Sequence, residues 1–305
     1  MRGWWQDLTD LVLPAECGGC GSARTVLCPR CRTALSGAAP RRVRPVPEPP
    51  GLPVVHAAAR YADEVRAVLL AHKERGVLAL TAPLGAALAG AVRAGLREVR
   101  PGAGGAGGVR ARGPVLLVPV PSARRAVRTR GHDPARRIAL AAAGELRRAG
   151  ASARVLAVLR QRHPVADQSG LGARQRLVNL AGALAVAPGG GRLLCGGGPV
   201  VLVDDLMTTG ASLTEAARAV RAATADAVMA GVDAGRPDAS ERGRGPATYR
   251  TAKSAVYPSA AGEGREERKT GPRMADPNGG GGVIREAICA AVVAASPDSF
   301  EINRN

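Results

Sequence analysis

Large aromatic side chains are scarce in this 305-residue chain, which has one Phe, three Tyr and two Trp. Nearly half of the residues (46%) are nonetheless apolar, so Ala, Val and Leu must fill the core. Such a core suits helices that pack on a parallel sheet. The scarcity of aromatic residues also removes the stacking platforms on which single-stranded nucleic acids commonly bind.

Lysine is the second scarcity, because only three of the 43 basic residues are Lys. The formal net charge of +18 would suit a nucleic-acid-binding protein, since Arg neutralises phosphates. The arginines are scattered along the chain, however, and such Arg usage is also expected from a GC-rich genome. Two interpretations stay open: nucleic-acid binding, and a site for a small phosphorylated metabolite that needs only a few arginines.

The patterns of exported and membrane-spanning proteins are also missing. Residues 1–10 contain no apolar signal core. The longest uncharged apolar stretch, Val77–Val92, is short for a membrane span and contains Pro83. We therefore expect Val77–Val92 to be a buried helix, and the protein to be cytoplasmic without membrane insertion.

Two common nucleotide-binding patterns are absent or misplaced. No lysine follows a glycine with the spacing of a Walker A loop. Gly102–Gly107 matches GxGxxG by letters, but it follows a helix-like run and precedes a strand, the reverse of the order in a dinucleotide-binding fold. The sequence therefore argues against a P-loop ATPase and against a Rossmann-type dinucleotide site.

Four of the six cysteines form two CxxC pairs near the N-terminus, Cys17 with Cys20 and Cys28 with Cys31. Two such pairs can place four thiolates tetrahedrally around one Zn²⁺. Disulfides are disfavoured in a reducing cytosol, and a redox site needs one pair rather than two. Four cysteine ligands leave no open coordination position, so we predict a structural zinc module; a metal-free relic is the alternative.

The strongest functional pattern lies between an apolar run and a helical pattern. Val200–Val203 is typical of a strand buried on both faces of a parallel sheet, and residues 212–223 carry apolar residues at helical spacing. A loop at such a junction directs backbone N–H groups and the helix dipole toward an anion. Its small and hydroxyl-bearing residues allow close approach and add donors: Thr208, Thr209, Gly210, Ala211 and Ser212.

Two carboxylates precede this loop. Asp204 and Asp205 cannot neutralise a phosphate, but they can accept hydrogen bonds from the vicinal hydroxyls of a ribose. Hydroxyl acceptors followed by phosphate donors fit a ribose 5-phosphate. The alternative is an acidic strand end followed by an ordinary N-capped helix.

An apolar strand, two acidic residues and a Thr-Thr-Gly loop resemble the motif with which type I phosphoribosyltransferases bind 5-phosphoribosyl pyrophosphate (PRPP). Over roughly residues 10–233 the chain is similar in particular to the ComF family of competence-associated proteins, which often join a four-cysteine module to such a domain. Tyr61–Gly76 resembles the family's opening strand and helix with its Lys. Val118–Ser122, at the end of the apolar run Val115–Val120, resembles its pyrophosphate loop, and Gln168–Asn179 resembles its third motif.

This resemblance implies transfer of a phosphoribosyl group with Mg²⁺ and release of pyrophosphate. Asp204 and Asp205 would hold the ribose as positive charge develops at its anomeric carbon, and residues 208–212 would bind the 5-phosphate. The remaining PRPP-binding residues would be Lys73, Arg124 and Arg128. The alternative function is a non-catalytic accessory protein of competence or DNA uptake, whose cysteine module docks a helicase or single-stranded DNA.

The fold expected from these patterns is α/β. We predict a type I phosphoribosyltransferase-like parallel sheet flanked by helices over residues 54–234, preceded by a zinc-ribbon-like module at residues 1–36 and a linker at residues 37–53. The short apolar run Ala227–Val232 is predicted to be the last strand of the sheet.

The C-terminal part changes in composition. Residues 235–282 are rich in Gly, Pro, Ser, Arg and Glu, and we predict that they are disordered because they cannot offset the entropy of ordering. Residues 283–305 form an apolar tail. Within this tail, Val283–Ala295 is expected either to dock on the domain as a helix or to remain a loose element.

Overall fold

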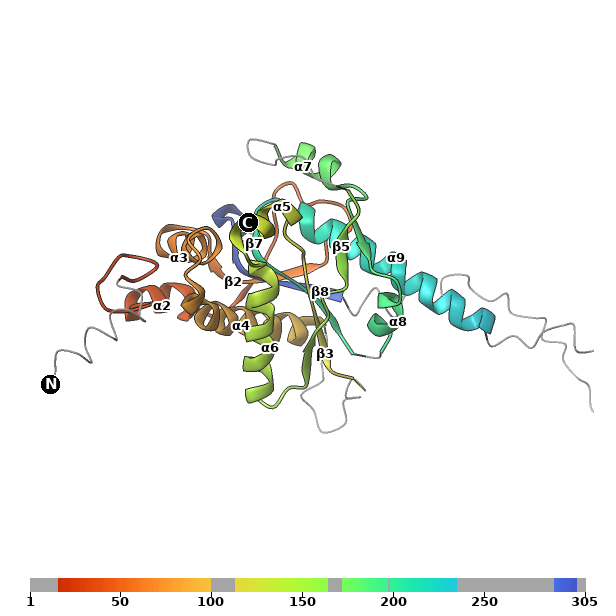
Figure 1. Cartoon of the computed structure of the whole chain (residues 1–305), viewed down its shortest axis with the longest axis horizontal. Helices are drawn as coiled ribbons and strands as arrows, with labels where there is room; N and C mark the ends of the chain where they lie inside the picture. Colours follow the sequence, from red (N-terminus) through yellow and green to blue (C-terminus); the bar gives the residue numbers. More distant parts are fainter. Residues whose placement is uncertain (1–15, 100–112, 164–171, 197, 235–287, 301–305) are drawn as a thin grey trace, which may run out of the picture.

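A sheet forms the centre of the protein (Figure 1). It has six strands in the order β1-β2-β8-β7-β3-β4. The computed structural model describes residues 16–99, 113–163, 172–196, 198–234 and 288–300. Only the edge pair β1–β2 is antiparallel; the other pairs are parallel. The strands are β1 (Arg41–Val43), β2 (Val54–Arg60), β3 (Val115–Pro119), β4 (Ala153–Val155), β7 (Val200–Met207) and β8 (Ile288–Ala295).

Helices cover both faces of this sheet. One face packs against α4 (Thr81–Val99) and α6 (Pro134–Arg148), and the other packs against α9 (Ala211–Ala234). Along β7 the side chains alternate between the two faces: Val201 and Val203 belong to the core under α4 and α6, whereas Leu202 belongs to the core under α9. The predicted α/β class, with a mostly parallel sheet flanked by helices, is confirmed.

The described C-terminal segment supplies a central strand. β8 lies between β2 and β7, pairs in parallel with both, and is buried along its whole length. The prediction of a docked helix or a loose tail was therefore wrong for residues 288–295. The uninterrupted run of Ile, Cys, Ala and Val at residues 288–295 has apolar residues at every spacing, so helical periodicity cannot be distinguished from a strand buried on both faces.

The predicted last strand, Ala227–Val232, is instead part of α9. Residues 211–234 are rich in Ala, the strongest helix former, and contain no Pro to stop the helix. The sheet consequently extends beyond the predicted boundary at residue 234, because β8 completes it. Residues 235–282, predicted to be disordered, lie outside the described residues.

The cysteine segment and the predicted linker are both joined to the sheet domain. Cys31 and Leu35, on α2 (Pro29–Ser36), are buried in the same core as Leu80 and Leu84. The predicted linker contains β1, which pairs with β2. The cysteine module therefore packs against the domain instead of standing apart from it.

The apolar stretch Val77–Val92, predicted to be a buried helix, lies largely in α4. By length and composition the helical stretch Leu78–Val99, with a mean hydropathy of 1.3, could cross a membrane. In the fold it packs against β8 and α6, and more than half of it is buried. Its apolar residues therefore serve as core.

Candidate functional site

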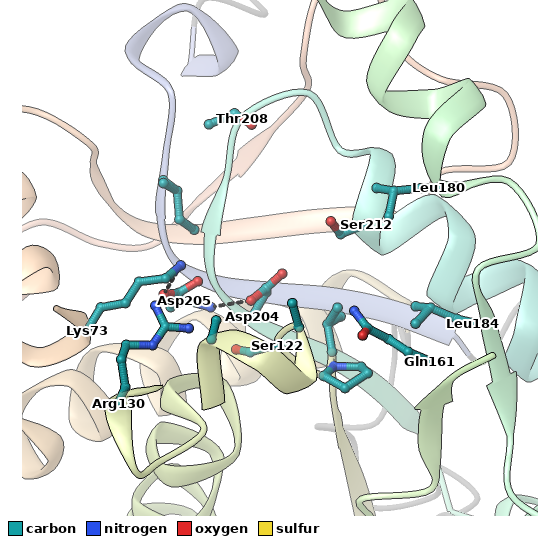
Figure 2. A pocket seen from close by; sticks show the side chains of 15 residues that line it. Lys73, Ser122, Arg130, Gln161, Leu180, Leu184, Asp204, Asp205, Thr208 and Ser212 are labelled. Atoms are coloured by element: carbon teal, nitrogen blue, oxygen red, sulfur yellow. Dashed lines mark hydrogen bonds and ion pairs between the residues drawn. The ribbon is translucent and has the colours of Figure 1, made fainter. Parts of the chain in front are cut away.

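A cavity of about 380 Å³ opens where β3 and β7 end. The carboxyl ends of parallel strands are the usual place for ligands in open α/β sheets. The lining combines charged, hydroxyl and apolar side chains (Figure 2): Lys73, Val120, Pro121, Ser122, Ala123, Ala126, Arg130, Gln161, Leu180, Leu184, Asp204, Asp205, Leu206, Thr208 and Ser212. Asp204, Asp205, Thr208, Ser212 and Lys73 were predicted from the sequence as site residues.

The acidic pair lies in the middle of this cavity. Asp205 is almost fully buried, and its Oδ2 atom is 3.0 Å from Nζ of Lys73. The carboxylate Oδ1 of Asp204 accepts a hydrogen bond from the backbone N–H of Asp205 at 2.9 Å. Burial, followed by the charge of Asp205, raises the pKa of Asp204 well above its ordinary value. The pair thus resists carrying two full negative charges without a cationic ligand or partner.

Lys73, the last residue of α3 (Asp63–Lys73), supplies a cation to this pair. Burial alone would lower the pKa of Lys73, but the carboxylates of Asp205 and Asp204 outweigh burial and raise it. The ammonium group therefore stays protonated at neutral pH. Its place beside Asp205 leaves the Asp204 carboxylate without an ion-pair partner among the described residues.

Arg130 is the second cation of the cavity and was not among the predicted binding residues. It ends α5 (Arg124–Arg130), and Gly131, with φ of 76°, lets the chain turn away directly after it. Nη1 of Arg130 lies 2.9 Å from Oε1 of Glu74, and the Arg130 side chain is only 13% exposed. The local sequence could not single it out, because α5 carries four arginines of which Arg130 alone lines the described cavity.

The two predicted arginines of the same helix, Arg124 and Arg128, lie on its exposed side. Neither is among the residues that line the cavity in the described part of the chain. The structure therefore brings Lys73 and the acidic pair together, and places these two arginines on the surface next to the site.

The predicted phosphate loop joins β7 to α9. Gly210 has a left-handed φ of 74°, and a Cβ atom there would lie 3.1 Å from a Leu52 methyl carbon, so the position needs glycine. Ala211 is buried and begins α9, and the backbone N–H of Thr214 bonds to the Gly210 carbonyl. Thr208 and Ser212 face the cavity, whereas the half-buried Thr209 is not among its lining residues. The first turn of α9 thus begins at the cavity, with backbone N–H groups that have no helical partner.

A small second sheet builds the wall opposite Lys73. β5 (Leu159–Gln161) pairs with β6 (Leu184–Val186), and the side chains of Gln161 and Leu184 face the cavity. Buried Glu215 holds this wall to α9, because its Oε1 accepts the backbone N–H of Leu184 at 3.0 Å. Arg218 bonds both Glu215 and the Leu184 carbonyl. This end of the site is neutral in its described lining and is connected to α9 by these hydrogen bonds.

The four predicted zinc ligands come together as a cluster. The sulfur atoms of Cys17, Cys20, Cys28 and Cys31 all lie within 4.8 Å of one another, a spacing that fits four thiolates around one tetrahedral Zn²⁺. A Cβ at Gly19 would lie 2.6 Å from Sγ of Cys31, so the first spacer needs glycine there. The donor set therefore fits a structural zinc ion.

The cluster also contains a thiol that ionises easily. Burial opposes ionisation of Cys17, but backbone N–H groups, foremost that of Cys28 at 3.3 Å, lower its pKa to about 6. A thiolate is the form that binds zinc. The module also contacts the segment directly after α3, because Arg75 donates a hydrogen bond to the Gly18 carbonyl.

Comparisons with protein families and with curated proteins gave no match that could identify the site. No protein-family model matches the chain, and no curated protein sequence matches it. The α/β fold, the cavity at the end of β7 and the four-cysteine cluster are therefore the grounds on which a function is proposed.

Proposed function

We propose that this protein has a phosphoribosyltransferase-like fold, binds PRPP in the cavity at the end of β7, and transfers its phosphoribosyl group to an acceptor with release of pyrophosphate. One observation carries the proposal. A single cavity holds a hydroxyl-lined strand–helix loop, a carboxylate pair and, on the Asp205 side of that pair, two cations. These three features match the order of chemical groups in PRPP: phosphate, ribose diol and pyrophosphate.

The 5-phosphate fits the loop at the start of α9. Thr208 and Ser212 offer hydroxyl donors, and the helix N-terminus adds backbone N–H groups and the positive end of its dipole. Gly210 keeps the loop backbone free of a Cβ where the turn is tightest. The arrangement suits a dianionic phosphate monoester.

The ribose then lies over Asp204 and Asp205, whose carboxylates accept hydrogen bonds from its hydroxyls. The pyrophosphate lies toward Lys73 and Arg130, which Figure 2 shows grouped beside Asp205. Mg²⁺, bound with the pyrophosphate, would neutralise part of its charge, and Asp204 and Asp205 are the kind of oxygen ligand that it prefers.

In the reaction the bond from the anomeric carbon to the pyrophosphate oxygen breaks, a bond to the acceptor forms, and the acceptor releases a proton. Positive charge builds on the ribose in the transition state, where the carboxylates of Asp204 and Asp205 stabilise it. Lys73 and Arg130 stabilise the departing pyrophosphate. The acceptor would occupy the neutral wall formed by Gln161, Leu180 and Leu184.

Two measurements test this proposal. Titration calorimetry with PRPP and Mg²⁺ tests binding, and pyrophosphate release with a panel of nucleobases and other ring nitrogen acceptors tests transfer. Binding together with acceptor-dependent release supports the enzyme. Absence of PRPP binding in folded protein would refute the proposed site. PRPP binding without pyrophosphate release for any acceptor would favour a non-catalytic protein that binds PRPP as a ligand.

One feature favours the alternative, an accessory protein of DNA uptake that binds single-stranded DNA or a helicase. Arginines on α5 and at the start of α6 are exposed next to the cavity: Arg124, Arg125, Arg128, Arg136 and Arg137. A titration with single-stranded DNA at several salt concentrations tests this alternative. When arginines contact phosphates, the logarithm of the binding constant falls linearly with the logarithm of the salt concentration.

A further inference from the structure

Arg176 reaches from α7 (Ala173–Leu180) to the proposed phosphate loop. Its Nη1 atom donates a hydrogen bond to Oγ1 of Thr208 at 3.2 Å, across 32 residues of sequence. The Nε atom of the same guanidinium is buried and has no hydrogen-bond partner among the described residues. A buried donor without an acceptor is costly. The hydrogen bonding of the guanidinium is therefore incomplete at its place beside Thr208, next to the residues that line the cavity.

The phosphate end of the cavity otherwise lacks a cation in its described lining. The two cationic side chains that line the cavity, Lys73 and Arg130, lie beside Asp205, away from Thr208 and Ser212 (Figure 2). A phosphate at the loop would then meet only neutral donors and the helix dipole, which is equivalent to roughly half a charge. A phosphate monoester carries close to two negative charges at neutral pH, so a full counter-charge is missing from the loop itself.

We propose that Arg176 supplies this counter-charge and is a specificity-determining residue for the phosphate monoester of a pentose 5-phosphate; the proposal rests on the function proposed above. A guanidinium is planar, always charged, and suited to bind two phosphate oxygens at once. Its bond to Thr208 uses a lone pair of Oγ1 and leaves the hydroxyl proton free to donate. Arg176 and Thr208 therefore act on the same phosphate as neighbouring donors.

The proposal gives α7 a function in ligand recognition. α7 packs against α9, whose N-terminus forms the other side of the same subsite. Ligands that carry the 5-phosphate engage α7 through Arg176, whereas pyrophosphate, bound at Lys73 and Arg130, does not. The affinities for the two kinds of ligand should consequently respond differently to changes at residue 176.

The test compares Arg176→Gln and Arg176→Lys with a matched control, Arg174→Gln. Arg174 lies one half-turn earlier on α7 and is exposed. Calorimetry would use three probes: ribose 5-phosphate, PRPP with Mg²⁺, and pyrophosphate with Mg²⁺. Circular dichroism and urea unfolding would establish that each variant is folded.

We expect Arg176→Gln to weaken binding of ribose 5-phosphate and PRPP on the order of 10- to 100-fold, as for loss of a charged hydrogen bond. Arg176→Lys should recover part of this affinity, because it keeps the charge without the planar fork. Arg174→Gln should bind like the parent protein, and pyrophosphate affinity should be the same in all variants.

Three outcomes would overturn the inference. The first is unchanged ribose 5-phosphate affinity in Arg176→Gln, and the second is an equal loss of pyrophosphate affinity, which would indicate a general distortion. The third is an equal effect of Arg174→Gln, which would indicate long-range charge alone. A parent protein that binds neither PRPP nor ribose 5-phosphate would instead refute the proposed function itself.

Discussion

Nζ of Lys73 lies 3.0 Å from Oδ2 of Asp205, and this ion pair joins the end of α3 to the end of β7. The carboxylate is 8% exposed, whereas the lysine side chain is one-third exposed. α3 in turn packs against the cysteine module. The pair therefore links the proposed metal module, through one helix, to the centre of the candidate site.

Lys73→Met should destabilise the fold, because it leaves the Asp205 carboxylate buried without its cation. Loss of a fully buried partner typically costs 3–5 kcal/mol, and partial exposure of Lys73 reduces the expected cost to about 1–2 kcal/mol. Urea unfolding measures it. The double change Lys73→Met with Asp205→Asn should regain much of the stability; equal losses in the single and double variants would contradict the pairing.

Stability should fall in mild acid because of His72. Burial, followed by the charge of His132, lowers the pKa of His72 to about 4. The pKa of His72 is lower in the folded protein than in the unfolded chain. The stability that depends on neutral His72 is therefore fully present above the unfolded pKa of about 6.5 and is lost as pH falls toward 4. Urea unfolding at pH 7 and pH 5 measures the loss, on the order of 1–2 kcal/mol.

His72→Gln is the matched variant for this prediction, since Gln can still bond Thr81, the hydroxyl partner of His72 at 3.1 Å. The variant should be less stable at pH 7 but should lose less stability between pH 7 and pH 5. An identical pH dependence in the two proteins would show that other groups govern acid unfolding.

Purified protein should contain about one zinc ion per chain, held by the four thiolates. Cys28→Ser should lower the free energy of unfolding of the whole domain, on the order of 2–4 kcal/mol. The reason is that Cys28 and Cys31 belong to the same core as Leu80 and Leu84. Metal analysis and urea unfolding measure the two effects.

Cys195→Ser is the control for that change, because Cys195 is exposed and outside the cluster. It should retain the zinc and the stability of the parent. Protein purified without chelator that contains no zinc would contradict the metal prediction. Separate unfolding of the N-terminal segment, with the rest unchanged, would contradict the shared core.

A chain that ends after Ala234 should fail to fold, although composition alone suggested that such a domain would stand by itself. It would lack β8, whose eight buried residues separate β2 from β7. Loss of this strand leaves the β8-facing edge of each neighbour unpaired and removes apolar contacts on both faces. Circular dichroism and size-exclusion chromatography measure the outcome. A chain that ends after Phe300 keeps β8 and should fold, and a folded Ala234 truncation would refute the central role of β8.

The variant Asp204→Asn with Asp205→Asn should lose turnover more than PRPP affinity. In the proposed reaction the carboxylates matter most when positive charge develops at the anomeric carbon, so the change should affect the transition state more than the bound substrate. Ser212→Ala should instead weaken PRPP binding by on the order of 1–2 kcal/mol, as it removes a phosphate donor. Pyrophosphate release and calorimetry separate the two effects. Equal losses of binding and turnover in the double variant would contradict the assigned role.

Local sequence patterns were enough to predict the elements that carry the proposed ligand loop. The run Val200–Val203 lies in β7, and Val115–Val120 overlaps β3. These predictions succeed because burial on both faces requires continuous apolar runs, and because the loop's glycine and hydroxyl residues are adjacent along the chain. The spacing of the two CxxC pairs likewise anticipated the cluster of four sulfur atoms.

The sequence by itself therefore determined the α/β class, the strand–loop–helix at residues 200–212 and the cluster of four cysteines. Only the tertiary structure decided that β8 is a central strand, that Arg130 and not Arg124 lines the cavity, and that Arg176 contacts Thr208. These relationships join residues far apart in the chain. Hydrophobic periodicity reports which face of an element is buried, but the partner across that face is set by packing of the whole core.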